Sequence, residues 1–391
     1  MNLDIKIKIK NREYNLLDIL AAAAVILFGI VLRVKLYDFI SGDYTEFLEK
    51  WTRILGVEGF KSLGDIWYNY TPLYMYVLYI IAKLPIYNLY GIKIFSGIFD
   101  LLLAGAVAKT SKHLRPSSNP LIPFAIVWFT PTIVSNSSMW GQCDSIYTFF
   151  IVMSFLYLMK EDSFETMLYF AFAFSIKLQS VFFAPVILLM FFLKKLRFRD
   201  FFLVPLVYII QIIPIWIAGR PLKSCLLIYL EQSRGKNGGI SVNYPNIFYL
   251  LMNDAYIDLY SGAAVVFTVC VLLVLMYHVL KKCYKNGINN TIILETVLAC
   301  GTIIVYLLPS MRERYSFMVD IIAIIYGLTI PKKLHIPILR IFISYMAYTT
   351  YYIHGEYVSY KILAAIGIYL IYDAVTTLLK ALEDKAKESA D

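Results

Sequence analysis

The sequence has 391 residues, of which 60% are hydrophobic and only 16% carry a charge. Soluble domains contain about 25% charged residues, so this composition excludes an ordinary soluble domain and favours an integral membrane protein. The net charge of +9 would suit a nucleic-acid partner in a soluble protein. Here the basic residues lie beside apolar blocks, where they orient helices and meet anionic lipids, so we expect membrane lipids as partners and no nucleic acid.

Apolar blocks follow one another along nearly the whole chain. They lie near 19–34, 71–84, 92–108, 120–135, 145–159, 165–176, 180–193, 201–218, 260–280, 291–308, 315–330, 336–353 and 358–379. A membrane-spanning helix requires about 20 mostly apolar residues, so the blocks predict an all-α polytopic protein with about 11–13 transmembrane helices. Because no soluble domain fits between the blocks, we expect a single transmembrane domain over 1–391.

Two long polar segments, 38–70 and 219–258, and a charged tail, 380–391, interrupt this pattern. Positive charge marks cytoplasmic helix ends, and it occurs before the first block, at 194–197, 281–282 and 332–333, and in the tail. We therefore expect a multi-pass protein of the cell membrane with a cytoplasmic N-terminus and tail, and with both polar segments on the outer face. Apolar residues at 47, 48, 51, 54 and 55 have the spacing of a helix on the membrane surface.

The topology of 71–120 stays open. The stretch 71–108 reads as two blocks, whereas a cytoplasmic loop at 109–115 requires one crossing or three. Either the block 71–84 is re-entrant, or the basic loop at 109–115 is external.

Cysteine and histidine give no sign of a metal site. The five cysteines include no CxxC pair, and the four histidines lie apart, so we expect neither a disulfide framework nor a histidine-based metal centre. Asp100, Glu295 and Asp320 lie within or near apolar blocks, where acids serve packing pairs or function, and the sequence does not decide between these uses.

The first polar motif, Gly42-Asp43-Tyr44, follows the first apolar block. A carboxylate between glycine and an aromatic residue at a membrane edge suits a base that takes a proton from an acceptor hydroxyl. The alternative is a solvated loop acid, and the other motifs favour the functional interpretation.

The second motif, 139–145, places Trp140, Gln142 and Asp144 at the start of another block. Trp140 and Gln142 offer stacking and hydrogen bonds to a sugar. Asp144 orients the acceptor, caps the helix or holds a divalent cation together with Asp43.

The third motif is Lys177-Leu178-Gln179, where a lysine interrupts a long apolar stretch. Such a lysine is usually paired or functional. The aromatic and amide-rich turns at 67–74 and 242–248 contain Tyr70, Asn243 and Asn246. Aromatic belts account for tyrosine and tryptophan at membrane edges, but the asparagines favour contact with a substrate.

The last motif is 308–315, in which Arg312 and Arg314 flank Glu313 and precede Tyr315. Two guanidinium groups form a fork that matches phosphate oxygens. Arginine is disfavoured on the outer face, so we favour phosphate binding over a structural ion pair.

These five motifs, in this order and over most of the chain, resemble the GT-C superfamily of membrane glycosyltransferases, and within it the prokaryotic proteins similar to the GPI-anchor mannosyltransferases. The resemblance implies a polyprenyl-phosphate sugar donor used on the outer face, with Asp43, the acid after the first span, as catalytic base. In many relatives a His-Glu-Arg-Tyr run helps to bind the donor phosphate. Arg312 stands in place of that histidine here, which keeps positive charge but removes a titratable group.

We therefore expect an inverting glycosyltransferase that moves a hexose, most simply mannose, from a polyprenyl-phosphate donor to a glycan, glycolipid or protein acceptor. No Gly-rich phosphate loop for a nucleotide-sugar is found, so the donor arrives in the membrane. Asp43 and Asp144 are expected as catalytic residues, and Arg312, Arg314 and Lys177 as phosphate ligands. Expected substrate contacts are Tyr44, Tyr70, Trp140, Gln142, Gln179, Asn243, Asn246, Glu313 and Tyr315. No metal ligands and no cofactor beyond an optional divalent cation are expected.

Two other functions fit parts of the pattern. A transporter or flippase of a lipid-linked sugar would explain the helices and the outer basic site, but such proteins often contain internal repeats, and none is evident here. An acyltransferase would require a buried histidine as base, and only His354 has a suitable position.

Overall fold

The computed structural model describes residues 6–9, 12–234, 239–251, 257–353 and 355–389. Within these ranges the chain is helical, apart from a short antiparallel hairpin of β1 (Lys6–Ile9) and β2 (Arg12–Asn15) that precedes the first helix. The predicted all-α class is confirmed, with this hairpin as a small addition. His354, the end of the charged tail at 390–391 and parts of the 219–258 segment lie outside the described residues.

Six helices among the described residues are long and apolar enough to cross a bilayer. They are α1 (Leu16–Lys35), α4 (Asn88–Leu114), η5 (Phe198–Phe202) continued by α10 (Leu203–Ile217), α14 (Ile257–Asn286), α15 (Asn290–Leu307) and α18 (Tyr360–Glu388). A bent pair of helices passes the same test when it is taken together, as either a broken span or a re-entrant segment. The pair consists of α5 (Leu121–Phe129) and the continuous α6 (Pro131–Val134) and η3 (Ser135–Trp140), with a bend of 53° between the two. The chain is thus a multi-pass membrane protein.

Shorter helices complete the described bundle. They are η1 (Tyr44–Leu48), α2 (Glu49–Glu58), η2 (Phe60–Gly64), α3 (Pro72–Lys83), α7 (Asp144–Met159), α8 (Ser163–Ile176), η4 (Leu178–Phe183), α9 (Ala184–Phe192), α11 (Leu222–Leu226), α12 (Ile228–Arg234), α13 (Phe248–Leu251), α16 (Phe317–Thr329), η7 (Pro331–Lys333) and α17 (His335–Ile353). Several of these are apolar, and the predicted 11–13 spans include them; that number stays a prediction.

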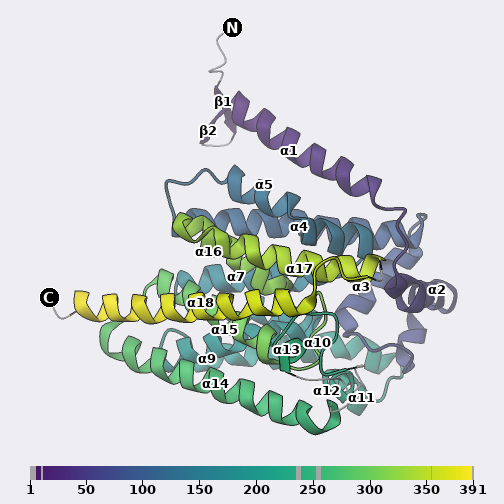
Figure 1. The fold of residues 1–391 in the computed structure, drawn as a ribbon. Coiled ribbons are helices and arrows are strands. Elements are labelled where there is room, and N and C mark those ends of the chain that lie inside the picture. Colours follow the sequence, from purple (N-terminus) through teal and green to yellow (C-terminus); the bar gives the residue numbers. More distant parts are fainter. Residues whose placement is uncertain (1–5, 10–11, 235–238, 252–256, 354, 390–391) are drawn as a thin grey trace.

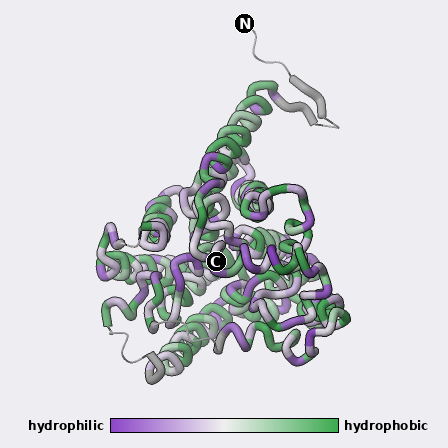
Figure 2. The backbone as a smooth tube through the Cα atoms, turned by 90° about the vertical axis from the view of Figure 1, so that its right-hand side faces the viewer, coloured by the Kyte–Doolittle hydropathy of each residue, from purple (hydrophilic) through white to green (hydrophobic). Residues whose placement is uncertain are grey.

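The helices form a bundle with a central and a peripheral set. In the most apolar stretch of α15, 89% of the residues are buried inside the protein, whereas in that of α1 only 11% are buried. Figure 1 shows α1 beside the bundle and α2, α11 and α12 gathered at the end away from the C-terminus. In Figure 2, α1 projects as a largely hydrophobic tube. An apolar helix with so little protein around it is suited to contact with lipid.

The helices break where the polar motifs lie. Pro131 begins α6 at a position where a missing N–H is tolerated, and Gly141 ends η3 in the left-handed conformation at φ 74°. Lys177 adopts extended backbone between α8 and η4, and Ser310 has φ 56° in the turn after α15. These breaks place motif residues on helix ends, from which their side chains reach a common site.

Two local expectations are refined by the structure. The helix expected near 47–55 exists as η1 and α2, but Leu48, Trp51 and Leu55 are buried within the protein, with α2 packed on α3, so this face does not rest on the membrane. The block 71–84 forms α3, whose 12 residues span about 18 Å. That length is short of the roughly 30 Å hydrocarbon core, which favours the re-entrant alternative.

Candidate active site

Asp43 precedes η1, and three donors from distant parts of the chain meet at its Oδ2. Trp140 Nε1 donates at 3.0 Å, Gln142 Nε2 donates at 2.6 Å, and Arg314 Nη1 lies 3.2 Å away. The Asp43 side chain keeps 21% of its surface exposed. The first, second and last sequence motifs therefore meet at one carboxylate that remains accessible.

The backbone around Asp43 is fixed by the same neighbours. Ser41 Oγ donates to the Trp140 carbonyl at 2.9 Å, and the Asp43 N–H donates to the Tyr351 hydroxyl at 3.0 Å. The Tyr351 ring stacks on Trp140, with 3.9 Å between the ring centroids. Tyr351 was not predicted from the sequence, although the closely spaced tyrosines 348, 351 and 352 on one helix were an available signal.

Asp43 opens onto a cavity of about 220 Å³. The predicted residues that line it are Asp43, Tyr70, Gln142, Lys177, Gln179, Arg312, Arg314 and Tyr315, and the additional ones are Phe47, Leu48, Trp51, Asn69, Tyr74, Ile176, Tyr229 and Gln232. The lining therefore combines one accessible acid, three cations, amides and a wall of aromatic rings. Trp51 belongs to the apolar face that the sequence assigned to the membrane surface, which is why its place in the cavity was missed.

Arg314 is the cation that pairs with Asp43. Its guanidinium carbon lies 5.2 Å from the centre of the Trp140 ring, and its Nε is buried with no hydrogen-bond partner among the described residues. Burial lowers the pKa of Arg314 and the Asp43 carboxylate raises it, and the pKa ends well above its ordinary value. The Arg314 guanidinium is therefore permanently charged at the cavity, and its Nε–H, unpaired among the described residues, is free to donate a hydrogen bond.

Asp144 does not line the cavity. It is fully buried and binds Lys177, with 2.5 Å between Lys177 Nζ and Asp144 Oδ1, while its Oδ2 accepts a hydrogen bond from Asn136 at 2.9 Å. Lys177 lines the cavity, so Asp144 reaches it only through this lysine. The shared divalent cation considered for Asp43 and Asp144 gains no support from this arrangement.

The other predicted contacts lie behind the cavity wall. Trp140 and Tyr44 are buried, and Glu313 lies beneath Arg314, with 3.5 Å between Glu313 Oε1 and Arg314 Nη1. Burial raises the pKa of Glu313 above its ordinary value, against the opposing effect of Arg314. These three residues shape the site from behind.

Asn246 contacts the start of the loop that carries the arginines, and Asn243 contacts the start of α18. Asn246 Nδ2 donates to the Leu308 carbonyl at 3.2 Å, and the Asn243 carbonyl accepts from the Tyr360 hydroxyl at 3.3 Å. Neither lines the cavity, so their contact with a substrate stays a prediction. In the part of the chain that the structure describes, no three His, Cys, Asp or Glu side chains are placed to hold a metal ion.

Comparison with known proteins gives one match. The sequence model of glycosyltransferase family 87 matches residues 67–308, which is more than half of the chain. The matched region includes Tyr70, Gln142 and Lys177, whereas Asp43 and the arginine loop lie just outside it. A search of curated proteins returned no match.

Proposed function

Because the chain belongs to glycosyltransferase family 87, a family of GT-C type membrane glycosyltransferases, we propose that it transfers a hexose from a polyprenyl-phosphate donor to an acceptor hydroxyl at the Asp43 cavity. Mannose is the first choice of sugar. The observation that carries the proposal is the accessible carboxylate of Asp43 beside three cations in one cavity.

Asp43 acts as the general base. In the described part of the chain, its recorded side-chain contacts all go to Oδ2, which leaves Oδ1 to accept the proton of the acceptor hydroxyl. Hydrogen bonds from Trp140 and Gln142 hold the carboxylate in one orientation, as base catalysis requires. A base oriented in this way contributes roughly 10²–10⁴-fold to the rate.

The reaction is a single displacement with inversion. The acceptor oxygen loses its proton to Asp43 and attacks the anomeric carbon as the bond from that carbon to the phosphate oxygen breaks. The leaving polyprenyl phosphate takes the electron pair, and Arg312, Arg314 and Lys177 stabilise its negative charge. No second carboxylate is required as nucleophile, by analogy with inverting glycoside chemistry.

The rest of the lining suits a sugar. Trp51, Tyr70 and Tyr74 contribute aromatic side chains to the lining, and Gln142 and Gln179 contribute amides. Aromatic and amide groups are the usual partners of sugar rings and hydroxyls. We place the cavity on the outer face of the cell membrane, from the distribution of positive charge along the sequence, with a glycan, glycolipid or protein as acceptor.

Family membership favours this enzyme over the transporter alternative, because the family is one of glycosyltransferases. The cation-lined cavity alone would serve either function. The two functions differ in that only the enzyme requires a proton transfer to Asp43.

The test is transfer of radiolabelled sugar from synthetic polyprenyl-phosphate mannose or glucose by purified protein in lipid nanodiscs, with extracted lipid as acceptor. Asp43→Asn should abolish transfer while its melting temperature stays near that of the wild type. Asp65→Asn is the matched control, since Asp65 is an exposed acid of the same polar segment that does not line the cavity. Normal transfer by Asp43→Asn would refute the assignment of the base, and tight donor binding without transfer would favour the transporter.

A further inference from the structure

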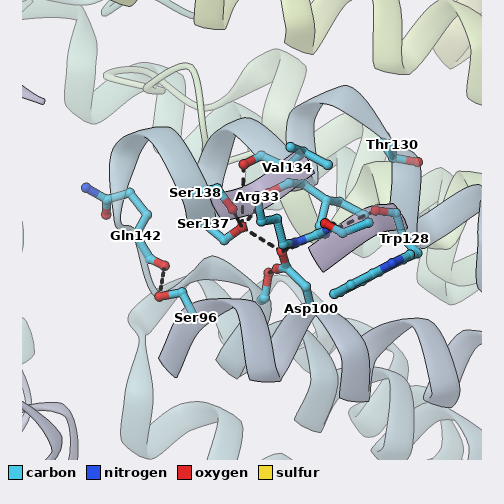
Figure 3. Close-up of polar contacts among 12 residues, drawn as sticks. Arg33, Ser96, Asp100, Trp128, Thr130, Val134, Ser137, Ser138 and Gln142 are labelled. Carbon is cyan, nitrogen blue, oxygen red and sulfur yellow. Dashed lines mark hydrogen bonds and ion pairs between the residues drawn. The ribbon is translucent and has the colours of Figure 1, made fainter. Parts of the chain in front are cut away.

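Helix α4 carries three polar side chains, Lys93, Ser96 and Asp100, that are almost completely buried. Their spacing of three and four residues places them on one face of the helix. Buried polar groups in a membrane helix are costly unless they are paired, and each of these three is paired with a segment that leads to or carries a proposed site residue. Figure 3 shows Ser96 and Asp100 with their partners.

Lys93 binds the turn that leads to Asp43. Its Nζ lies 2.8 Å from the Tyr37 carbonyl and 2.5 Å from the Phe39 carbonyl. Both carbonyls belong to the turn that follows the end of α1 at Lys35. Backbone carbonyls require a hydrogen-bond partner when they are buried, so the ammonium group satisfies them and fixes the path of the chain after α1.

Asp100 joins α1 to the helix break that carries Trp140 and Gln142. Its Oδ2 accepts from Arg33 Nη2 at 2.9 Å and from Ser137 Oγ at 2.6 Å, and its Oδ1 accepts from Ser145 Oγ. Ser137 and Ser145 precede and follow the break, and Figure 3 shows Asp100 between Arg33 and Ser137. The Asp100 carboxylate therefore anchors α1, which precedes Asp43. It also anchors η3 and α7, which lie on either side of the break that carries Gln142.

Ser96 has the most direct connection to the site. Its hydroxyl donates to the Gln142 carbonyl at 2.8 Å, and the Gln142 side chain donates to Asp43 Oδ2 at 2.6 Å. Ser96 thus holds the backbone of a residue that orients the proposed base, without lining the cavity itself.

We propose that Lys93, Ser96 and Asp100 are positioning residues, which set the placement of Asp43 against Trp140 and Gln142 and thereby the rate of transfer. This inference rests on the proposed role of Asp43 as base. Lys93 fixes the segment after α1 that carries Asp43, and Ser96 fixes the segment that carries Gln142. Asp100 binds residues next to both segments. A displacement of about 1 Å at a reacting group costs as much as 10²-fold in rate, so a single hydrogen bond that sets this geometry has a measurable effect.

Ser96→Ala is the most informative variant, because it removes one hydroxyl and leaves no buried charge without a partner. Ser154→Ala is the matched control. Ser154 is also fully buried, and its hydroxyl donates to the Thr166 carbonyl at 2.8 Å, so it loses the same kind of bond away from the cavity. Ser111→Ala is a second control on α4 itself, since the buried Ser111 hydroxyl has no hydrogen-bond partner among the described residues.

Two measurements on the full-length protein decide the matter. With labelled polyprenyl-phosphate mannose, Ser96→Ala should lower kcat about 10-fold and leave the donor KM unchanged, whereas both controls keep the wild-type kcat. Hydrogen exchange followed by mass spectrometry should show faster exchange over residues 135–143 in Ser96→Ala alone. A kcat equal to that of Ser154→Ala, or unchanged exchange over 135–143, would overturn the inference.

The exchange measurement requires no substrate, so it judges the positioning role even if the donor is of another class. Full transfer by Asp43→Asn would refute the proposed base and not the observation that Ser96 holds the 135–143 segment. Lys93→Met is the second variant, and it should increase exchange over residues 36–43 while Ser154→Ala does not.

Discussion

Asp43 and Asp144 both lie at the end of an apolar segment, and the structure gives them opposite surroundings. Asp43 is 21% exposed at the cavity, and neutral donors share its Oδ2 with Arg314. Asp144 is fully buried, and Lys177 is bound to it at 2.5 Å. An acid open to the cavity can exchange a proton with a substrate, whereas a buried acid beside a lysine neutralises that lysine.

The difference shows that charge at a membrane edge marks the neighbourhood of a site without giving each residue its role. Lys177 is one of the three cations that line the cavity, and the buried Asp144 carboxylate supplies its counter-charge. We therefore propose that Asp43 takes part in the chemistry and that Asp144 supports Lys177, the proposed phosphate ligand, and the following variants test this division.

The largest effect is expected at Asp43. Asp43→Asn preserves size and the capacity to accept hydrogen bonds but removes the basic carboxylate, so kcat should fall by about 10³-fold. The melting temperature should change little, because the side chain is partly exposed and keeps its neutral donors. The measurement is transfer of labelled sugar beside a thermal melt, and a loss explained by unfolding would remove the contrast with Asp144.

Asp144→Asn should act mainly on stability. It leaves the Lys177 ammonium buried without a counter-charge, and removal of one partner of a buried pair costs about 3 kcal/mol or more. The melting temperature should fall sharply, and addition of Lys177→Met should restore part of it. A stable Asp144→Asn protein with a severe loss of kcat would reverse the comparison and assign the chemistry to Asp144.

Arg314→Gln should weaken use of the donor. Loss of one group that stabilises developing charge typically costs about 10²-fold in rate, and the loss should appear in kcat/KM for the polyprenyl-phosphate donor. Varying the acceptor at saturating donor should reveal a much smaller change in acceptor KM. Equal losses on both substrates would contradict a phosphate-binding role.

The convergence of Asp43, Gln142, Lys177 and Arg314 was predictable because each interrupts or ends an apolar block. In a bundle of membrane helices, polar groups at such breaks are costly to expose to lipid, so they gather at a shared polar site. The common cavity agrees with that expectation, and the family match supports the glycosyltransferase function.

The individual contacts were beyond the reach of the sequence. Tyr351 is 308 residues away from Asp43 along the chain, and a tyrosine in an apolar helix is equally typical of an aromatic belt. Asparagine is a residue type that suits sugar binding, but the Asn246 side chain donates to the Leu308 carbonyl and accepts from the Phe248 N–H. The backbone carbonyl of Asn243 accepts from the Tyr360 hydroxyl. The sequence indicated no partner for Asp100, because Arg33 lies in another helix, 67 residues away along the chain.

Glu313 is a third acid at the site and sharpens the comparison further. It is 1% exposed, and its Oε2 has no hydrogen-bond partner among the described residues. Burial raises the pKa of its carboxyl despite the nearby Arg314. Glu313 is therefore neither an acid exposed to the cavity like Asp43 nor a buried acid with a hydrogen bond to each oxygen like Asp144.

A raised pKa means that the folded protein holds this proton more tightly than the unfolded chain does. The stability that it contributes is complete below the ordinary glutamate pKa of about 4.3 and is lost as the pH rises through the higher folded value. Glu313→Gln imitates the protonated form, so its melting temperature should match the wild type in acid and lie slightly above it at neutral pH. The exposed Glu46 provides the control Glu46→Gln, which should not change this difference. A wild type that instead gains stability over Glu313→Gln with rising pH would show that Arg314 pairs with ionised Glu313, as Lys177 pairs with Asp144.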